Sequence, residues 1–155
     1  MSARLEIAEL TTDREILAAF PLMSILRDRL RPETFLEEIR LQEAQDFRLI
    51  GGYAEGKLVA VTGVRRTHTT ARGPHAFVDD LITLPGEQGK GYATQMLQYV
   101  AAQSAANGLP HVYLDSRATA LGFYDKLSFR FLTSIPCWIP SETLANLVIK
   151  ASSEP

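Results

Sequence analysis

The residues from Pro85 to Thr94, PGEQGKGYAT, hold three glycines together with a glutamine and a lysine. They stand between an apolar run that ends at Leu84 and an amphipathic segment that continues from Ala93. Glycines in this place have two uses. They can form a tight turn between a strand and a helix, or they can let backbone N–H groups approach a phosphate where a Cβ atom would intrude. Phosphate binding is therefore the first chemistry that the sequence suggests.

Two common phosphate-binding patterns fit this stretch poorly. A P-loop requires glycine five positions before the Gly89-Lys90 pair and Ser or Thr after the lysine, but Leu84 and Gly91 stand there. A dinucleotide fingerprint requires glycine in place of Thr94 and an acidic residue about 20 residues further on, after a second strand. The sequence clearly provides neither this glycine nor this acidic residue. A strand-to-helix turn without a ligand stays open as the alternative.

A third pattern, Gln/Arg-x-x-Gly-x-Gly/Ala, is met by Gln88, Gly91 and Ala93. A second segment, ATALGFYDKLSF (118–129), resembles a motif commonly written Asn-x-x-Ala-x-x-hydrophobic-Tyr-x-Lys-x-Gly-Phe. Its matching residues are Ala120, Phe123, Tyr124, Lys126 and Phe129. Together the two segments resemble the GNAT N-acetyltransferase superfamily over nearly the whole chain, about residues 4–139.

The resemblance departs from the family pattern at two positions. Arg117 stands where asparagine is usual, and Ser128 stands where glycine is usual. The first departure puts a cofactor contact from that position in question, and Arg117 is kept as a candidate contact. The second implies a different turn into the following segment.

The resemblance implies acetyl-CoA as cosubstrate and no metal. In the family, the glycine loop and the start of the next helix hold the pyrophosphate of acetyl-CoA. The corresponding residues here are Gln88, Gly89, Lys90, Gly91, Tyr92, Ala93 and Thr94. The preceding strand parts from its parallel neighbour and binds the pantetheine arm through its backbone, which corresponds here to Leu81, Ile82 and Thr83. A backbone N–H of this strand can also stabilise the oxyanion of the tetrahedral intermediate.

Tyr124 matches the tyrosine that the family often uses as general acid toward the thiolate of coenzyme A. A phenol with a pKa near 10 is protonated at neutral pH and can donate a proton. The alternative is a core tyrosine on one helix stripe with Leu121 and Leu127.

Asp79 and Asp80 are the candidates for the base, in the strand FVDDLITL. Strand alternation predicts that they point to opposite faces of the sheet. Two acids in a largely apolar strand require water or cationic partners, because burying an unpaired charge is costly. A cleft that binds an amine meets this requirement, and so does structural pairing with Arg65, Arg66 or Arg117.

The pattern of apolar residues predicts a mixed α/β sheet with helices on both faces, in the order β-α-α-β-β-β-α-β-α-β. A short strand and two or three short helices come first, with Asp13 as a helix cap. Strands are expected at 47–55, 57–67 and 75–84, with a hairpin at Glu55-Gly56. A helix follows the glycines, and the last elements are a strand at 111–116, a helix at 118–127, a strand at 128–139 and a helix from Ser141. Residues 1–155 are expected to form one domain, with a frayed end at 151–155.

The remaining reactive residues indicate no further site. His68, His75 and His111 are interpreted as surface histidines. Cys137, the only cysteine, is expected to be a buried, inert thiol, and it allows neither an internal disulfide nor a cysteine-based metal site.

Composition favours a cytoplasmic protein. The formal net charge of −2 does not favour nucleic-acid binding, and no apolar run is long enough to span a membrane. The start of the chain lacks the layout of a signal peptide.

The predicted function is acetyl transfer from acetyl-CoA to a primary amine by direct attack in a ternary complex. The alternatives are a GNAT-fold module that binds an acyl-CoA without turnover, and an unrelated α/β nucleotide-binding domain. The acceptor is a small-molecule or peptide amine, and the two aspartates favour a cationic one. The family often forms homodimers, so a homodimer is one expectation.

Overall fold

The computed structural model describes residues 3–148. The chain divides into two compact units, which meet in sequence at Asp115 and Ser116. The elements of the first unit are β1 (Glu6–Glu9), α1 (Asp13–Ala18), α2 (Phe20–Leu26), α3 (Phe35–Glu43), β2 (Phe47–Ala54), β3 (Lys57–Thr69), β4 (Gly73–Thr83), α4 (Tyr92–Ala106) and β5 (Val112–Leu114). The second unit contains the 3-10 turn η1 (Ala118–Ala120), α5 (Leu121–Lys126) and α6 (Ser141–Ala145).

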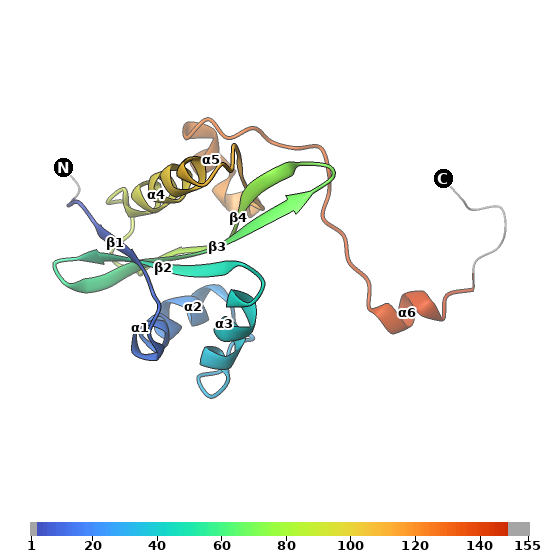
Figure 1. Cartoon of the computed structure of the whole chain (residues 1–155), viewed down its shortest axis with the longest axis horizontal. Coiled ribbons are helices and arrows are strands. Elements are labelled where there is room, and N and C mark those ends of the chain that lie inside the picture. Colours follow the sequence, from blue (N-terminus) through green and yellow to red (C-terminus); the bar gives the residue numbers. More distant parts are fainter. Residues whose placement is uncertain (1–2, 149–155) are drawn as a thin grey trace. The chain divides into compact units, whose positions relative to one another are not determined.

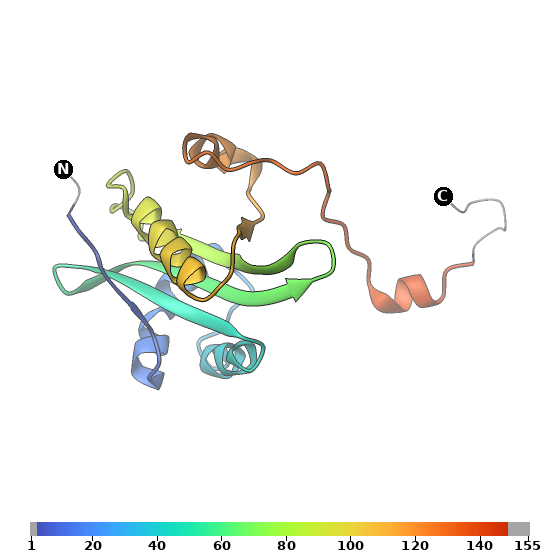
Figure 2. The same ribbon diagram turned by 45° about the horizontal axis from the view of Figure 1, so that its top comes forward.

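The first unit is a five-stranded sheet in the order β1-β2-β3-β4-β5. Neighbouring strands are antiparallel except for β4 and β5, which run parallel. Helices α1, α2 and α3 cover one face of the sheet, and α4 crosses the other (Figure 1; Figure 2). The predicted mixed sheet with helices on both faces is therefore confirmed. The hairpin at Glu55-Gly56 is confirmed as well, with φ angles of 50° and 77° at its two turn residues.

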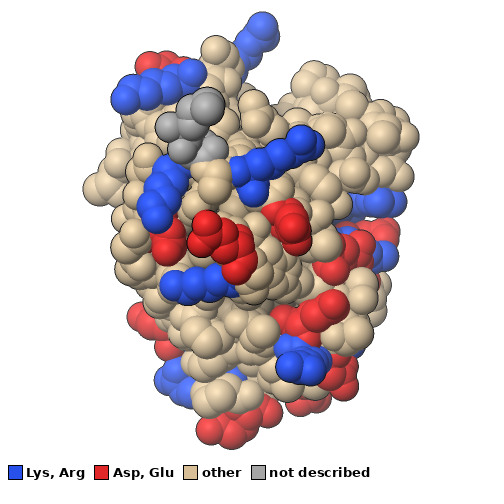
Figure 3. Space-filling view, turned by 90° about the vertical axis from the view of Figure 1, so that its left-hand side faces the viewer, with Lys and Arg blue, Asp and Glu red and all other residues tan. Residues whose placement is uncertain are grey.

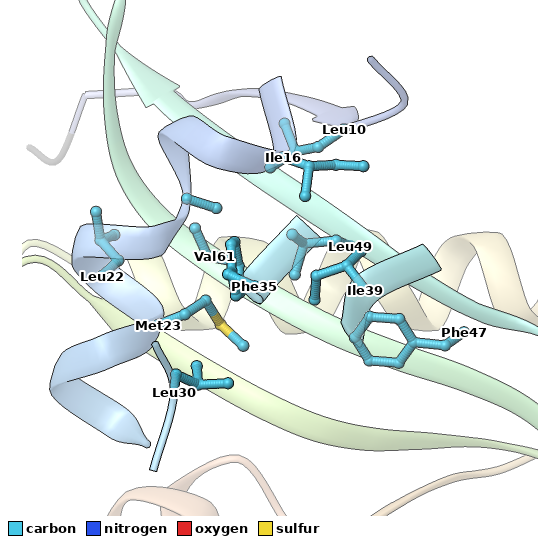
Figure 4. Close-up of a cluster of buried hydrophobic side chains, with 11 residues drawn as sticks. Leu10, Ile16, Leu22, Met23, Leu30, Phe35, Ile39, Phe47, Leu49 and Val61 are labelled. Atoms are coloured by element: carbon cyan, nitrogen blue, oxygen red, sulfur yellow. The ribbon is translucent and has the colours of Figure 1, made fainter. Parts of the chain in front are cut away.

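The main core lies between the sheet and helices α1–α3, where apolar side chains from both layers point toward one another (Figure 4). Its largest fully buried members are Phe35, Phe47, Leu10, Ile16, Ile39 and Leu49. Helix α1 begins with a capping box: the Thr12 hydroxyl accepts from the Glu15 N–H, and the Glu15 carboxylate accepts from the Thr12 N–H. The cap is thus Thr12 and not Asp13. Pro21 lies in the first turn of α2, where its missing N–H costs nothing.

The second unit differs from the sequence prediction. Residues 128–139 were expected to form the last strand, but they form neither strand nor helix, and every residue from 131 to 148 is exposed. No residue of the described part of this unit, 116–148, is buried. Cys137, expected to be a buried thiol, is exposed as well. An apolar, β-branched composition does not by itself make a strand, because the backbone groups of a strand also need a neighbouring strand with which to pair.

Over residues 3–148, none of the helices combines the length and the apolar character that crossing a membrane requires.

Candidate functional site

The glycine loop, residues 85–91, joins the end of β4 to the start of α4. Gly86, Gly89 and Gly91 all adopt left-handed backbone conformations, with φ angles of 87°, 80° and 77°. Only glycine takes up such angles without strain. A Cβ atom built on Gly86 or Gly89 meets no atom within 4 Å. The backbone conformation, rather than crowding within the protein, therefore requires the glycines, and the space beside them is open to a ligand.

The start of α4 offers N–H groups to that space. Gly91 is the N-cap and has no side chain to accept a hydrogen bond from the first turn. The first helical bond runs from the Gln95 N–H to the Gly91 carbonyl at 3.1 Å, so the N–H groups of Tyr92, Ala93 and Thr94 have no acceptor within the helix. The first turn contains no acidic residue. Because α4 is 15 residues long, its dipole favours an anion at this end.

The charged residues of the loop pair with one another. Lys90 Nζ lies 2.5 Å from Glu87 Oε2, and Lys57 Nζ lies 3.9 Å from Glu87 Oε1. The hydrogen bond to Glu87 raises the pKa of Lys90, and the bond to Lys90 lowers the pKa of Glu87. Lys90 therefore does not point freely into solvent. Gln88, between them, is exposed.

A groove of about 890 Å³ runs beside the loop. One wall is the glycine loop and the first residue of α4, and the other is the β2–β3 turn, with Glu55 and Lys57. On the face shown in Figure 3, basic and acidic side chains are interspersed, without a continuous area of one sign. The surface charges therefore offer an anion no concentrated positive area, and the N–H groups at the start of α4 are the candidate groups for binding one.

Strand β4 loses one partner partway along its length. It pairs with β3 as far as Thr83, but with β5 only as far as Val78. From Asp79 onward, the edge of β4 that faces away from β3 has no strand partner among the described residues. Leu81, Ile82 and Thr83 lie on this open stretch and are half-buried. An extended ligand can pair with the backbone there as an additional strand would.

A β-bulge marks the point where the strands part. Gly63 of β3 faces Asp80, whereas its neighbour Val64 faces Val78, so Asp79 is an extra residue in β4. Gly63 is required here for close approach, since a Cβ atom on it would lie 2.7 Å from Asp80 Oδ2 and 2.5 Å from the Phe47 ring. Bulges are common beside active sites because they redirect side chains.

The bulge removes the alternation from which Asp79 and Asp80 were predicted to face opposite sides. The same guanidinium, that of Arg27, donates from Nε to Asp80 Oδ1 at 2.8 Å and from Nη2 to the Asp79 carbonyl at 2.6 Å. Arg65 donates to both oxygens of the Asp79 carboxylate, at 2.7 and 3.1 Å. The two carboxylates therefore belong to one cluster that contains two arginines.

Asp80 is the more buried of the two acids, with 8% of its surface exposed. Burial raises the pKa of Asp80 above the ordinary value for aspartate, while the hydrogen bond and charge of Arg27 lower it. The charge of the neighbouring Asp79 raises it further. The Thr62 hydroxyl holds the strand in place by donating to the Asp80 carbonyl at 2.7 Å.

Arg27 is the functional candidate that the sequence did not reveal. It is the C-cap residue of α2, and its N–H donates to the Met23 carbonyl at 2.9 Å. Leu22 and Met23 anchor α2 in the core (Figure 4), and this places the guanidinium over β4. Arg65 was among the expected partners of the acids, and the structure confirms its pairing with Asp79. Nothing near Arg27 in the sequence marks it, because its partners lie more than 50 residues away.

Tyr124 and Arg117 belong to the second unit. Tyr124 lies in α5, half-buried, with its ring edge-on to Phe123 and Phe129 at centroid distances of 5.0 and 5.3 Å. Burial raises the pKa of its phenol, which keeps the proton on the oxygen at neutral pH. Arg117 is exposed and precedes η1. Their roles toward a cofactor remain predictions.

His75 corrects the interpretation of all three histidines as surface residues. It is 1% exposed, its Nδ1 lies 2.8 Å from the Gly73 carbonyl, and its ring is edge-on to Tyr113. His68 and His111 are exposed, as expected. Within residues 3–148, no three His, Cys, Asp or Glu side chains come together as a metal site.

Comparison with known proteins identifies the class that this geometry fits. The family model described as the acetyltransferase (GNAT) family matches residues 14–129. An uncharacterized N-acetyltransferase of Bacillus subtilis (strain 168), YhdJ, is 29% identical over 130 residues, covering 81% of this chain and 92% of the relative.

Solved structures agree with this on the level of the fold. Aminoglycoside N-acetyltransferase AAC(6')-Iy, in complex with CoA, matches with a TM-score of 0.78 and 14% identity over 91% of this chain and 97% of that one. Glucosamine-6-phosphate N-acetyltransferase from Arabidopsis thaliana matches with a TM-score of 0.70 and 20% identity over 90% and 99%. The fold is thus that of an acyltransferase. This chain belongs to the GNAT acetyltransferase family.

Proposed function

We propose that the protein transfers the acetyl group of acetyl-CoA to a primary amine by direct attack within a ternary complex. The observation that carries the proposal is the continuity of the open edge of β4 with the uncapped start of α4. One run of backbone, from Leu81 to Thr94, presents unpaired groups to an extended ligand and then N–H groups to an anion. A pantetheine arm followed by a diphosphate has this chemistry.

The residues present fit acetyl-CoA. The left-handed backbone at Gly89 and Gly91 and the empty space beside Gly89 leave room for a diphosphate at the N–H groups of Tyr92, Ala93 and Thr94. Leu81, Ile82 and Thr83 would bind the pantetheine arm through their backbone. Gln88 and Lys90 flank the phosphates, and Arg117 is a further candidate contact. These assignments follow the family motif and the open backbone together.

In the proposed reaction, the nitrogen of a neutral amine attacks the thioester carbonyl carbon. A C–N bond forms, the C–S bond breaks, and the amine loses one proton while the departing thiolate gains one. The Asp79–Asp80 pair is suited to receive the amine proton, because both carboxylates stand at the bulge where β4 and β5 part. Tyr124 is suited to donate the proton to the thiolate, because its phenol stays protonated at neutral pH.

The acceptor is proposed to be a small-molecule or peptide amine without a marked charge preference. The sequence favoured a cationic acceptor because of the two aspartates. In the structure, Arg27 and Arg65 pair with these acids, so the cluster has no net negative charge. The basis for a cationic preference is therefore removed.

One domain is proposed for the whole chain. The family match, residues 14–129, continues from the first unit into the second, and residues 116–148 contain no buried residue from which a separate core could form.

The test is an assay of CoA release from acetyl-CoA with a panel of primary amines of different charge. CoA is quantified by chromatography, since the exposed Cys137 would react with thiol reagents. Release that depends on an amine supports the proposal. If calorimetry shows acetyl-CoA binding but no amine yields release, the protein is an acyl-CoA binding module instead. If neither binding nor release is seen, the site assignment is wrong.

A further inference from the structure

A row of side chains crosses the sheet beside the acid cluster, which the two aspartates form with their two arginines. Phe47 of β2 pairs in register with Arg65 of β3, which pairs with Phe77 of β4. Phe77 in turn pairs with Tyr113 of β5. Residues paired across neighbouring strands point to the same face, and Phe47 belongs to the core between the sheet and α1–α3 (Figure 4). Because Arg65 binds the Asp79 carboxylate, the rings of Phe77 and Tyr113 lie next to the acid cluster, on the face that carries these helices.

Arg72 covers this pair of rings. Its Cζ lies 4.4 Å from the centroid of the Tyr113 ring and 6.0 Å from that of Phe77, within the range of cation–π attraction. The residue stands in the short turn between β3 and β4. There its N–H donates to Thr69 Oγ1 at 3.2 Å, and Gly73 takes a left-handed conformation with a φ angle of 67°. The turn and the rings together hold the half-buried Arg72 in one place.

The charge of Arg72 has no acid to balance it in the described part of the first unit. Among residues 3–115, no carboxylate forms an ion pair or a hydrogen bond with its side chain. Residues 56–78, which include β3 and the start of β4, contain no aspartate or glutamate. By contrast, Arg65 is bound by Asp79. A guanidinium that is partly removed from water and lacks an acid offers its planar set of N–H donors to an anionic ligand.

The two rings connect Arg72 with the place of the proposed acetyl transfer. Phe77 and Tyr113 lie one residue before β4 and β5 lose their pairing. Asp79 follows Phe77 by two positions, which is on the order of 7 Å along an extended strand. An acceptor whose amine lies at the acid cluster can therefore cross the rings and reach Arg72 with a spacer of a few C–C bonds.

We propose that the acceptor amine carries a carboxylate a few bonds from its nitrogen, and that Arg72 binds this carboxylate while the spacer lies over Phe77 and Tyr113. The proposal rests on the proposed acetyl transfer and names the substrate class of the same site. Such an amine is a zwitterion at neutral pH, without net charge, which agrees with the balanced charges of the acid cluster. Phosphate oxygens can bind a guanidinium in a similar way, so the test includes a phosphate.

The first experiment compares matched primary amines in the assay of CoA release. An ω-amino acid, its carboxamide and an aminoalkyl phosphate of the same chain length differ only in their end group. For the wild type, KM for the ω-amino acid is expected to be about tenfold below KM for the carboxamide, as one charge-assisted contact provides, with a similar kcat. Equal KM values overturn the proposal, and a KM that is lowest for the phosphate overturns the assignment of a carboxylate.

A second experiment uses variants of the arginine. Arg72→Gln is expected to raise KM for the ω-amino acid to that for the carboxamide, while kcat and the affinity for acetyl-CoA stay as in the wild type. Arg72→Lys keeps the charge without the planar set of donors and should give an intermediate KM. The matched control is Arg66→Gln, in the same hairpin. Arg66 lines a pocket with Tyr99 and Val100 of α4, on the opposite face of the sheet, so its loss should leave KM unchanged.

A binding measurement separates this proposal from acetyl transfer itself. Ligand-observed NMR titrations of the wild type and Arg72→Gln, both saturated with CoA, compare the ω-amino acid with the carboxamide without turnover, and circular dichroism verifies the fold of each variant. If amines yield CoA release but the ω-amino acid is not preferred, or stays preferred in Arg72→Gln, the carboxylate proposal fails and acetyl transfer stands. If no amine yields release, the proposed function fails. The carboxylate proposal then stands only if the wild type, and not Arg72→Gln, binds the ω-amino acid more tightly than the carboxamide.

Discussion

The glycine loop and the acid cluster lie at opposite ends of the open stretch of β4, and they are built in different ways. The proposed anion-binding end consists of consecutive residues, 85–94, and it presents backbone N–H groups and left-handed glycines. The acid cluster at the other end depends on partners from elsewhere: Asp80 is held by Arg27, 53 residues away, and Asp79 by Arg65, from the neighbouring strand.

This difference explains why the local sequence predicts the glycine loop well and the charge state of the two aspartates poorly. A backbone site is specified locally, since the turn and the helix start are enough to present the N–H groups. The charge state of an acid is not specified by its own position, because burial and an opposing guanidinium shift its pKa in opposite directions. The glycine loop should therefore respond to changes in binding, and the acid cluster to changes in the rate and its pH dependence.

The largest expected effect is on turnover at the acid cluster. For at least one of Asp79→Asn and Asp80→Asn, we expect kcat to fall by about 100-fold, within the usual range for loss of a general base. The affinity for acetyl-CoA, measured by calorimetry, is expected to stay unchanged. Glu38→Gln, which removes an acid paired with Arg29 away from β4, serves as control. Unchanged kcat in both aspartate variants would mean that water or another group takes the proton.

Tyr124→Phe removes the proposed proton donor while it keeps the aromatic contacts with Phe123 and Phe129. We expect kcat to fall by about 30-fold, less than for the base, because a thiolate can leave without full protonation. The control is Tyr99→Phe, on α4. Steady-state kinetics with a fixed amine measures both, and equal rates for the two variants would remove Tyr124 from the mechanism.

At the loop, Gly91→Glu is expected to weaken acetyl-CoA binding by about tenfold or more, because it adds bulk, backbone strain and negative charge at the phosphate site. Gly108→Glu is the matched control. Gly108 follows α4 at its other end, has a similar φ angle of 72°, and also has open space around it. Calorimetry that shows equal affinities for the two variants would refute the loop assignment.

Much of the fold follows from the sequence because its signals are local. The hairpin at Glu55-Gly56, the helix after the glycines and its end at Gly108 are all set by residues within one turn of the feature. The strand expected at 128–139 failed for a different reason. Its composition suits a strand, but a strand exists only with a neighbour, and neighbours are not visible in composition.

The candidate site also contains features that the local sequence predicts and features that depend on distant residues. The loop residues lie where the motif predicted, whereas the relative facing of Asp79 and Asp80 was wrong because a single extra residue in β4 changes the alternation. His75 was misjudged because its burial involves contacts between strands, such as the one with the Tyr113 ring on β5, which the local sequence does not show. Arg27 was missed because it reaches the cluster only through the packing of α2.

The link between Arg27 and Asp80 predicts a shift in the pH profile. Arg27→Gln removes the group that lowers the pKa of Asp80, so this pKa should rise further, with burial and Asp79 still raising it and Arg65 still lowering it. If Asp80 must be ionised to act, the rising limb of kcat against pH moves to higher pH. Because the pKa of Asp80 is higher in the folded state than in the unfolded state, the free energy of unfolding falls as pH rises from the unfolded-state pKa to the folded-state pKa. In the variant, this fall should extend over a wider pH range.

Arg29→Gln is the control, because Arg29 pairs with Glu38 at the surface. If the rising limb of kcat against pH stays at the same pH in Arg27→Gln while kcat falls, then Arg27 only supports the position of α2 and does not set the pKa of Asp80.

The smallest expected effect is that of replacing Glu87 on the affinity for acetyl-CoA. It tests how much charged side chains contribute to a site made mainly of backbone N–H groups. Glu87 engages Lys90 and lies near Lys57, so it competes with any phosphate for both cations. Glu87→Gln removes this competition. Acetyl-CoA affinity should therefore increase by about two- to threefold at low salt, as expected for exposed charges, and the gain should disappear near 0.5 M salt, roughly, as screening increases. If the gain persists at high salt, Glu87 acts on the loop conformation and not through charge, since only a Coulombic effect is screened.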